Sequence, residues 1–119
     1  MRTPGPDHPI TVAPQPGRVR VLLDGVAVAD TGAALRLTEA RYPVVLYIPR
    51  ADIRMECFVR SARTSHCPYK GDAIYYDLVV AGTRRPDAVW SYEDPYPAVA
   101  EIKGHVAFYP DRVDAIETA

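Results

Sequence analysis

Short runs of alternating hydrophobic and polar residues, separated by turns rich in proline and glycine, make up most of this chain. Residues 18–22 alternate charged and apolar side chains, and residues 26–29 resume the hydrophobic run after Asp24-Gly25. An Asp-Gly pair between two such runs is typical of a two-residue β-hairpin turn. The pattern therefore predicts an antiparallel hairpin in this part of the chain.

The remaining strands are predicted by the same criteria. Residues 43–48 form an apolar run next to prolines at both ends, which indicates a central strand, and residues 73–80 are the longest candidate. Further strands are predicted at residues 34–38, 56–60, 89–92 and 105–109, short helical turns at 49–54 and 98–103, and a loop at 82–87. Residues 61–65 are polar and are expected to hydrogen-bond along their own backbone. The fold class is therefore mainly β, with compact, mostly antiparallel sheets of short strands and one or two short helical turns.

The two ends of the chain are predicted to lie outside the packed structure. Residues 1–17 contain five prolines, a composition that favours a flexible, extended arm. Residues 110–119 are expected to fray. This interpretation leaves residues 18–116 as a single β domain.

Composition and charge disfavour some classes of binding partner. At 119 residues the chain has the length of one domain, and its net charge of -1 does not favour nucleic acid or acidic lipid. No apolar run reaches the roughly 18 residues of a membrane span, and the start lacks the apolar core of a signal peptide. We therefore expect a cytoplasmic protein that binds neither nucleic acid nor membrane, and we expect its two cysteines to be free thiols. Its oligomeric state is not predicted.

The segment from residue 66 to residue 76 concentrates reactive side chains. Pro68 favours a turn, and Gly71 can adopt the positive φ angle that ends it. Lys70-Gly71, together with Arg50 and Arg54 four residues apart on a helical turn, is a candidate anion site, because cations and exposed backbone N–H groups attract negative charge. The alternative is a solvated lysine, with the arginines paired to acidic neighbours on the surface.

Aromatic residues predict a pocket near this turn. Trp90 and Tyr92 lie on one face of their strand, and Tyr75 on the neighbouring strand can join them. The alternative is that these rings belong to the core. Glu39 is a candidate acid or base in the pocket, although a surface carboxylate is the favoured interpretation.

Cys67 is a candidate nucleophile, since a nearby cation or imidazole would favour its thiolate. His66 precedes it directly, but neighbouring strand residues point to opposite sides, so Lys70 or a residue from elsewhere in the chain is the better-placed base. The alternative is a small buried side chain at a turn. The catalytic candidates are thus Cys67, Lys70 and His66.

Four motifs carry a resemblance to a known family. They are residues 47–50 (Tyr-Ile-Pro-Arg), 66–71 (His-Cys-Pro-Tyr-Lys-Gly), 90–92 (Trp-Ser-Tyr) and 106–109 (Val-Ala-Phe-Tyr). Over residues 18–115 the chain resembles the bacterial and fungal family called domain of unknown function 427, which also carries a nucleotidyltransferase-like label. The resemblance implies the tent-like β fold of the Mss4 and methionine sulfoxide reductase B group. The chain lacks the paired carboxylates that would hold magnesium for phosphoryl transfer, so its residues give the label little support.

Many proteins of that fold group bind zinc through two Cys-x-x-Cys pairs, and this chain has none. The possible ligands Cys57, Cys67, His66 and His105 include an adjacent pair that would point apart, and His105 is more simply a half-buried strand residue. We therefore expect no metal and no cofactor.

The main functional hypothesis is a pocket that binds a small polar or anionic molecule. Whether the protein also transforms that molecule is left open. One alternative is a protein-interaction module using the aromatic strand and the proline-rich arm, and another is a thiol- or nucleotide-dependent enzyme. The predicted ligand-binding residues are Arg50, Arg54, Cys67, Tyr69, Lys70, Gly71, Tyr75, Trp90 and Tyr92.

Overall fold

The computed structural model describes residues 1–119 and contains ten β-strands in two antiparallel sheets. The seven-stranded sheet has the order β1-β4-β5-β9-β8-β7-β6, and the three-stranded sheet has the order β10-β2-β3. The strands are β1 (Ile10–Pro14), β2 (Val19–Leu23), β3 (Val26–Thr31), β4 (Leu35–Glu39), β5 (Val45–Pro49), β6 (Phe58–Cys67), β7 (Gly71–Val80), β8 (Thr83–Tyr92), β9 (His105–Phe108) and β10 (Ala115–Thr118). The predicted fold class is confirmed.

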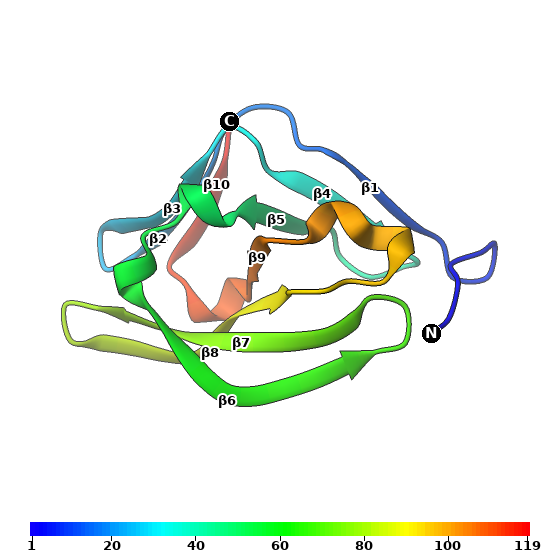
Figure 1. Ribbon diagram of the computed structural model, residues 1–119. Helices are drawn as coiled ribbons and strands as arrows, with labels where there is room; N and C mark the ends of the chain where they lie inside the picture. The colour runs from blue at the N-terminus through cyan, green and yellow to red at the C-terminus, as the bar shows by residue number, and fades with distance from the viewer.

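The seven-stranded sheet curves strongly (Figure 1). Strands β6, β7 and β8 run along the bottom of the view, β1, β4 and β5 lie above them, and the three-stranded sheet stands at the left. The helical segments are 3-10 turns: η1 (Arg50–Asp52), η2 (Met55–Cys57), η3 (Pro97–Ile102) and η4 (Pro110–Arg112). None of them has the length and hydrophobicity that a bilayer-spanning helix requires.

Two hydrophobic clusters pack against opposite faces of β7 and β8. The larger has 16 buried residues and includes Val21 and Val28 of the three-stranded sheet together with Tyr76. The smaller has eight buried residues and includes Tyr75 and Tyr92. Because successive strand residues point to opposite faces, the neighbours Tyr75 and Tyr76 enter different clusters.

Two predicted turns are confirmed. Asp24 and Gly25 both have positive φ angles, as a type I′ turn requires, and they join β2 to β3. At the second turn Cys67 pairs with Gly71, so β7 folds back along β6. Gly71 has a φ angle of 112°, and the Tyr96 N–H donates to the carbonyl of Lys70 at 2.9 Å.

The predicted flexible arm is wrong over residues 10–14. These residues form β1, which pairs with β4 at the edge of the large sheet, and Ile10 and Val12 pack against the smaller cluster. The alternation of Ile10, Thr11 and Val12 was obscured by the surrounding prolines. An edge strand tolerates Pro14 because it has a side on which no N–H donor is needed.

The predicted fraying of residues 110–119 is also wrong. Ala115–Thr118 forms β10 and pairs with β2, and Ile116 packs against the larger cluster. A four-residue strand has too few positions for its alternation to stand out in the sequence. Its stability comes from the sheet and the cluster that it covers.

The predicted loop at 82–87 and the polar segment at 61–65 lie within strands. Residues 61–65 belong to β6 and residues 82–87 mostly to β8, and both strand pairings shift register nearby. At the second irregularity Asp87 has a φ angle of 49°, and its N–H donates to the Asp77 carboxylate at 2.8 Å. Such bulges interrupt the regular ladder, which allows Pro86 within a strand.

Candidate functional site

A pocket of about 190 Å³ lies beside the smaller cluster, and we call it the tyrosine pocket. Four tyrosines and the only tryptophan make up most of its wall, and one ammonium group reaches it. The lining residues are Leu37, Val45, Tyr47, Lys70, Tyr75, Trp90, Tyr92 and Tyr109. They come from β4, β5, β7 and β8, the turn before β7, and the residue that follows β9.

Strand alternation explains how these side chains meet. Val45 and Tyr47 are two residues apart on β5, and Trp90 and Tyr92 are two residues apart on β8, so each pair shares one face. Tyr75 lies opposite Trp90 in the β7–β8 pairing. The curved sheet brings these three strands around one hollow.

Three phenols of the pocket, those of Tyr47, Tyr92 and Tyr109, stay protonated at neutral pH because their pKa values are raised. Burial is the largest cause that raises the pKa of Tyr47 and of Tyr92 above the ordinary value of 10.0. Burial, followed by the neighbouring Tyr75 hydroxyl, likewise raises the pKa of Tyr109. The Trp90 Nε1–H donates to the Tyr47 oxygen at 3.2 Å, which leaves the Tyr47 O–H as a donor.

Lys70 belongs to a partly buried charge cluster. Its side chain is 12% exposed, and its ammonium donates to Glu39 Oε1, while Glu39 Oε2 lies 2.7 Å from His8 Nε2. Burial by itself would raise the pKa of Glu39, but the hydrogen bonds from Lys70 and His8 outweigh it and lower that pKa below 4.5. Glu39 is therefore a carboxylate at neutral pH. The His8 ring also stacks on Tyr69, with ring centres 4.0 Å apart.

The structure brings four of the predicted ligand-binding residues together. Lys70, Tyr75, Trp90 and Tyr92 all line the tyrosine pocket. The interpretation of Glu39 as a surface carboxylate is wrong, because Glu39 is buried and bonded to Lys70. Its position at the end of β4 directs it toward the turn that carries Lys70.

The two predicted arginines do not join Lys70. Arg50 donates to the Ser91 hydroxyl and to the Glu93 carboxylate, each at 3.1 Å, and its guanidinium lies 5.8 Å from the Tyr76 ring centre. Ser91 and Tyr76 face the larger cluster, on the opposite side of the sheet from the tyrosine pocket. The predicted helical turn is only the three residues of η1, so Arg54 falls outside it and is exposed. The predicted anion site with three cations is therefore not formed.

The other predicted residues surround the turn rather than line the pocket. Cys67 is half-buried against the smaller cluster, whereas His66 is exposed and lies 2.7 Å from Asp72 across the strand pair. The two side chains point apart, as expected, and do not form a thiol–imidazole pair. Tyr69 stacks on His8, and Gly71 shapes the backbone.

The possible zinc ligands are not gathered. No group of three or more histidine, cysteine, aspartate or glutamate side chains is arranged to hold a metal ion, and both cysteines are free. His105 lies half-buried on β9, with its Nδ1 2.9 Å from the Lys103 carbonyl.

Sequence reasoning missed several parts of the pocket. Tyr47 sits in an apolar run, and its alternation with Val45 was a usable signal. Tyr109 is the last residue of the predicted strand 105–109, but no local pattern indicated that its ring lines a pocket. Leu37 was missed as a wall residue. His8 carried no signal, because its segment was interpreted as a flexible arm.

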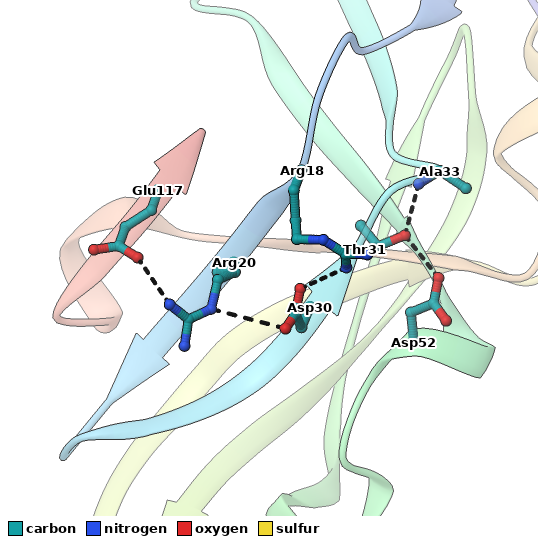
Figure 2. Close-up of polar contacts among 7 residues, drawn as sticks. All are labelled: Arg18, Arg20, Asp30, Thr31, Ala33, Asp52 and Glu117. Carbon is teal, nitrogen blue, oxygen red and sulfur yellow. Dashed lines mark hydrogen bonds and ion pairs between the residues drawn. The ribbon is translucent and has the colours of Figure 1, made fainter. Parts of the chain in front are cut away.

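A second polar cluster lies on the three-stranded sheet (Figure 2). Arg18 donates to Asp30 at 2.8 Å, and Arg20 lies 3.8 Å from Asp30 and 3.6 Å from Glu117. These side chains are 46–58% exposed, and both cations have carboxylate partners. Such exposed pairs contribute little to stability, and here they join neighbouring strands at the surface.

Comparison with known proteins gives a family. No curated protein matches the chain. A protein-family model described as domain of unknown function DUF427 matches residues 11–119, which begins within β1 and covers both sheets. The chain therefore belongs to the DUF427 family.

Proposed function

We propose that this domain binds a small molecule bearing hydrogen-bond acceptor atoms, polar or anionic, in the tyrosine pocket. One observation carries the proposal: protonated phenols and an ammonium group converge on a hollow with otherwise apolar walls. Donors fixed around a small buried space are suited to carboxylate or carbonyl oxygens, because hydrogen bonds to charged or partly charged acceptors are the stronger ones.

Lys70 supplies the charged donors. An ammonium group has three N–H bonds, and the hydrogen bond to Glu39 uses one of them. Glu39 balances the lysine charge, so the pocket offers directed hydrogen bonds and little net charge. This balance favours a neutral or singly charged ligand over a polyphosphate.

The size of the pocket limits the ligand further. Its 190 Å³ lies below the range of about 300–1,000 Å³ common for drug-sized ligands. Since one water molecule occupies about 30 Å³ in the liquid, the pocket has space for roughly six groups of that size. A short carboxylic acid or carbonyl compound suits that space, whereas a nucleotide does not, so a nucleotide-dependent enzyme has less support.

Thermal-shift and calorimetric titrations with acetate, pyruvate, acetamide and inorganic phosphate test the proposal. We expect at least one of these probes to stabilise the wild type, since a ligand that binds only the folded state raises its melting temperature. Tyr92→Phe removes one pocket hydroxyl and should weaken binding of that probe about tenfold, the usual effect of losing a hydrogen bond to a charged group.

Tyr76→Phe is the matched control. Tyr76 is buried to the same degree as Tyr92, 8% against 6% exposed, but it faces the larger cluster. This variant should bind the probe as the wild type does. If no probe binds, or if both variants lose the same affinity, the proposal is wrong.

The other hypotheses have less support. An interaction module that pairs through the aromatic strand is disfavoured because β8 lies inside the sheet, between β7 and β9. A thiol enzyme is disfavoured because both candidate bases have other partners: His66 lies against Asp72, and Lys70 is bonded to Glu39. We also propose that the fold is similar to that of the Mss4 group, which is supported by the two antiparallel sheets packed around one shared core.

A further inference from the structure

We propose that a second cavity, between the two sheets, is a binding site for a linear hydrocarbon chain. This apolar cleft has a volume of about 350 Å³ and is distinct from the tyrosine pocket. Val21 of β2 and Ile116 of β10 line it from the three-stranded sheet, and Leu46 of β5 and Phe108 of β9 line it from the large sheet. The proposal does not depend on the function proposed above.

The lining excludes charged and strongly polar ligands. Nine of the eleven lining residues are hydrophobic and the other two are prolines, so no charged side chain reaches the cleft. The side-chain polar groups are the Tyr42 hydroxyl and the Trp90 N–H, and the latter already donates to Tyr47. Water in the cleft has few partners there, whereas a hydrocarbon would replace it without losing hydrogen bonds.

The rim of the cleft is also apolar. Five large hydrophobic side chains are exposed in the protein, and two of them, Tyr42 and Val44, line this cleft. They lie in the connection between β4 and β5 and are 64% and 40% exposed. A chain entering the cleft would cover apolar surface that otherwise contacts water, which favours binding.

The position of the cleft suggests the shape of the ligand. Packed sheets lie about 10 Å apart, so a gap in their shared layer of side chains is a slot rather than a wide chamber. A methylene group has a size similar to that of water, which takes about 30 Å³, so the cleft holds roughly ten of them. An unbranched chain fits such a slot.

Trp90 provides a direct readout. It is the only tryptophan in the chain, and it lines both the apolar cleft and the tyrosine pocket. Titration with 1-alkanols of four to twelve carbons, followed by Trp90 fluorescence, should give a Kd that falls about fourfold for each added methylene. The fall should stop near ten carbons, when the cleft is full. A Kd independent of chain length would overturn the proposal.

Two matched substitutions locate the site. Val44→Asp places a carboxylate at the rim, whereas Met55→Asp places one at a hydrophobic residue of similar exposure, 45%, outside the cleft. The first should abolish the chain-length dependence and the second should retain it. Equal losses in both variants would mean that the alkanols bind non-specifically and would contradict the proposal.

Two further variants keep the test decisive. If Val44→Asp does not fold, Ile116→Trp on β10 narrows the cleft from its other side and should also weaken binding, measured here by calorimetry because the second tryptophan would obscure the Trp90 signal. Unchanged binding in a folded Ile116→Trp protein would overturn the proposal. Tyr92→Phe alters only the tyrosine pocket, so it should bind alkanols normally. A loss there would assign the alkanols to the tyrosine pocket and contradict a second site.

Discussion

The pair of Lys70 and Glu39 is the central feature at the scale of single residues. The two side chains are 12% and 11% exposed, and His8 contacts the same carboxylate. Removing one partner of a buried ion pair is costly because the other charge is left without compensation. The pair therefore ties the turn before β7 to the end of β4 while it supplies the donors of the pocket.

Glu39→Gln should lower the free energy of unfolding by about 3 kcal/mol at pH 7, because it leaves the largely buried Lys70 ammonium without a counter-charge. Chemical denaturation measures this change. The exposed Glu101 offers a control, and Glu101→Gln should change stability by less than about 0.5 kcal/mol. Equal effects would show that Glu39 is not part of a buried pair.

Glu39 should also make the stability of the protein depend on pH. The pKa of Glu39 is lowered in the folded state, so its contribution is fully present above 4.5 and is lost as pH falls through the folded pKa. Wild-type stability should therefore decrease below pH 4.5, and Glu39→Gln should show a shallower decrease. Part of the decrease that remains in Glu39→Gln comes from Asp77, whose pKa is also lowered in the folded state, chiefly by the hydrogen bond from the Asp87 N–H. Unfolding curves between pH 2.5 and 6 that are parallel for the two proteins would contradict this account.

At the scale of single elements, the turn from Pro68 to Gly71 positions Lys70. Gly71 has a φ angle of 112°, and a Cβ placed there would lie 3.4 Å from the Asp94 carbonyl oxygen. Gly71→Ala should therefore reduce stability by about 1–2 kcal/mol, since side chains disfavour positive φ angles. Gly32→Ala is the control, because Gly32 lacks a positive φ and has space for a methyl group. Denaturation of both variants checks the prediction, which fails if their losses are alike.

Elements with their own local signals could be predicted from the sequence. Asp24-Gly25 specifies its hairpin through turn conformation, and Pro68 with Gly71 does the same for the second. Residues 10–14 and 115–118 could not be predicted in this way, since their strands depend on β4 and β2, which lie far away in sequence. Their packing outweighs a local composition that favours loops.

The pocket was predictable only to the extent that its residues share a strand face. Alternation correctly grouped Trp90 with Tyr92, and the neighbouring strand added Tyr75. It could not show that β5 curves over the same hollow and adds Tyr47. It also could not show that Arg50 approaches β8 from the opposite face, because that depends on the order of strands in the sheet.

At the scale of the whole molecule, both ends of the chain complete the fold. The first nine residues bring His8 to Glu39, and β10 closes the three-stranded sheet over the larger cluster. Residues far apart in sequence therefore meet at both cavities. Trp90 lines both cavities, so a ligand bound in one cavity would contact a side chain that also borders the other.

The role of β10 can be measured with two neighbouring substitutions. Ile116 packs against the larger cluster, so Ile116→Ala should reduce stability by about 1–2 kcal/mol, at the lower end for a partly buried side chain. Glu117 is exposed, and Glu117→Ala should cost less than about 0.5 kcal/mol. A frayed terminus would instead give no loss in either variant by chemical denaturation.

The most direct test of the tyrosine pocket uses the eight tyrosines as an internal comparison. Four of them line the pocket, and the others do not: Tyr42, Tyr69, Tyr76 and Tyr96. In a protein with carbon-13-labelled tyrosine rings, titration of the best-binding probe, such as acetate, should shift the NMR signals of Tyr47, Tyr75, Tyr92 and Tyr109 with one common Kd. Shifts spread equally over all eight rings, or confined to the other four, would contradict the account.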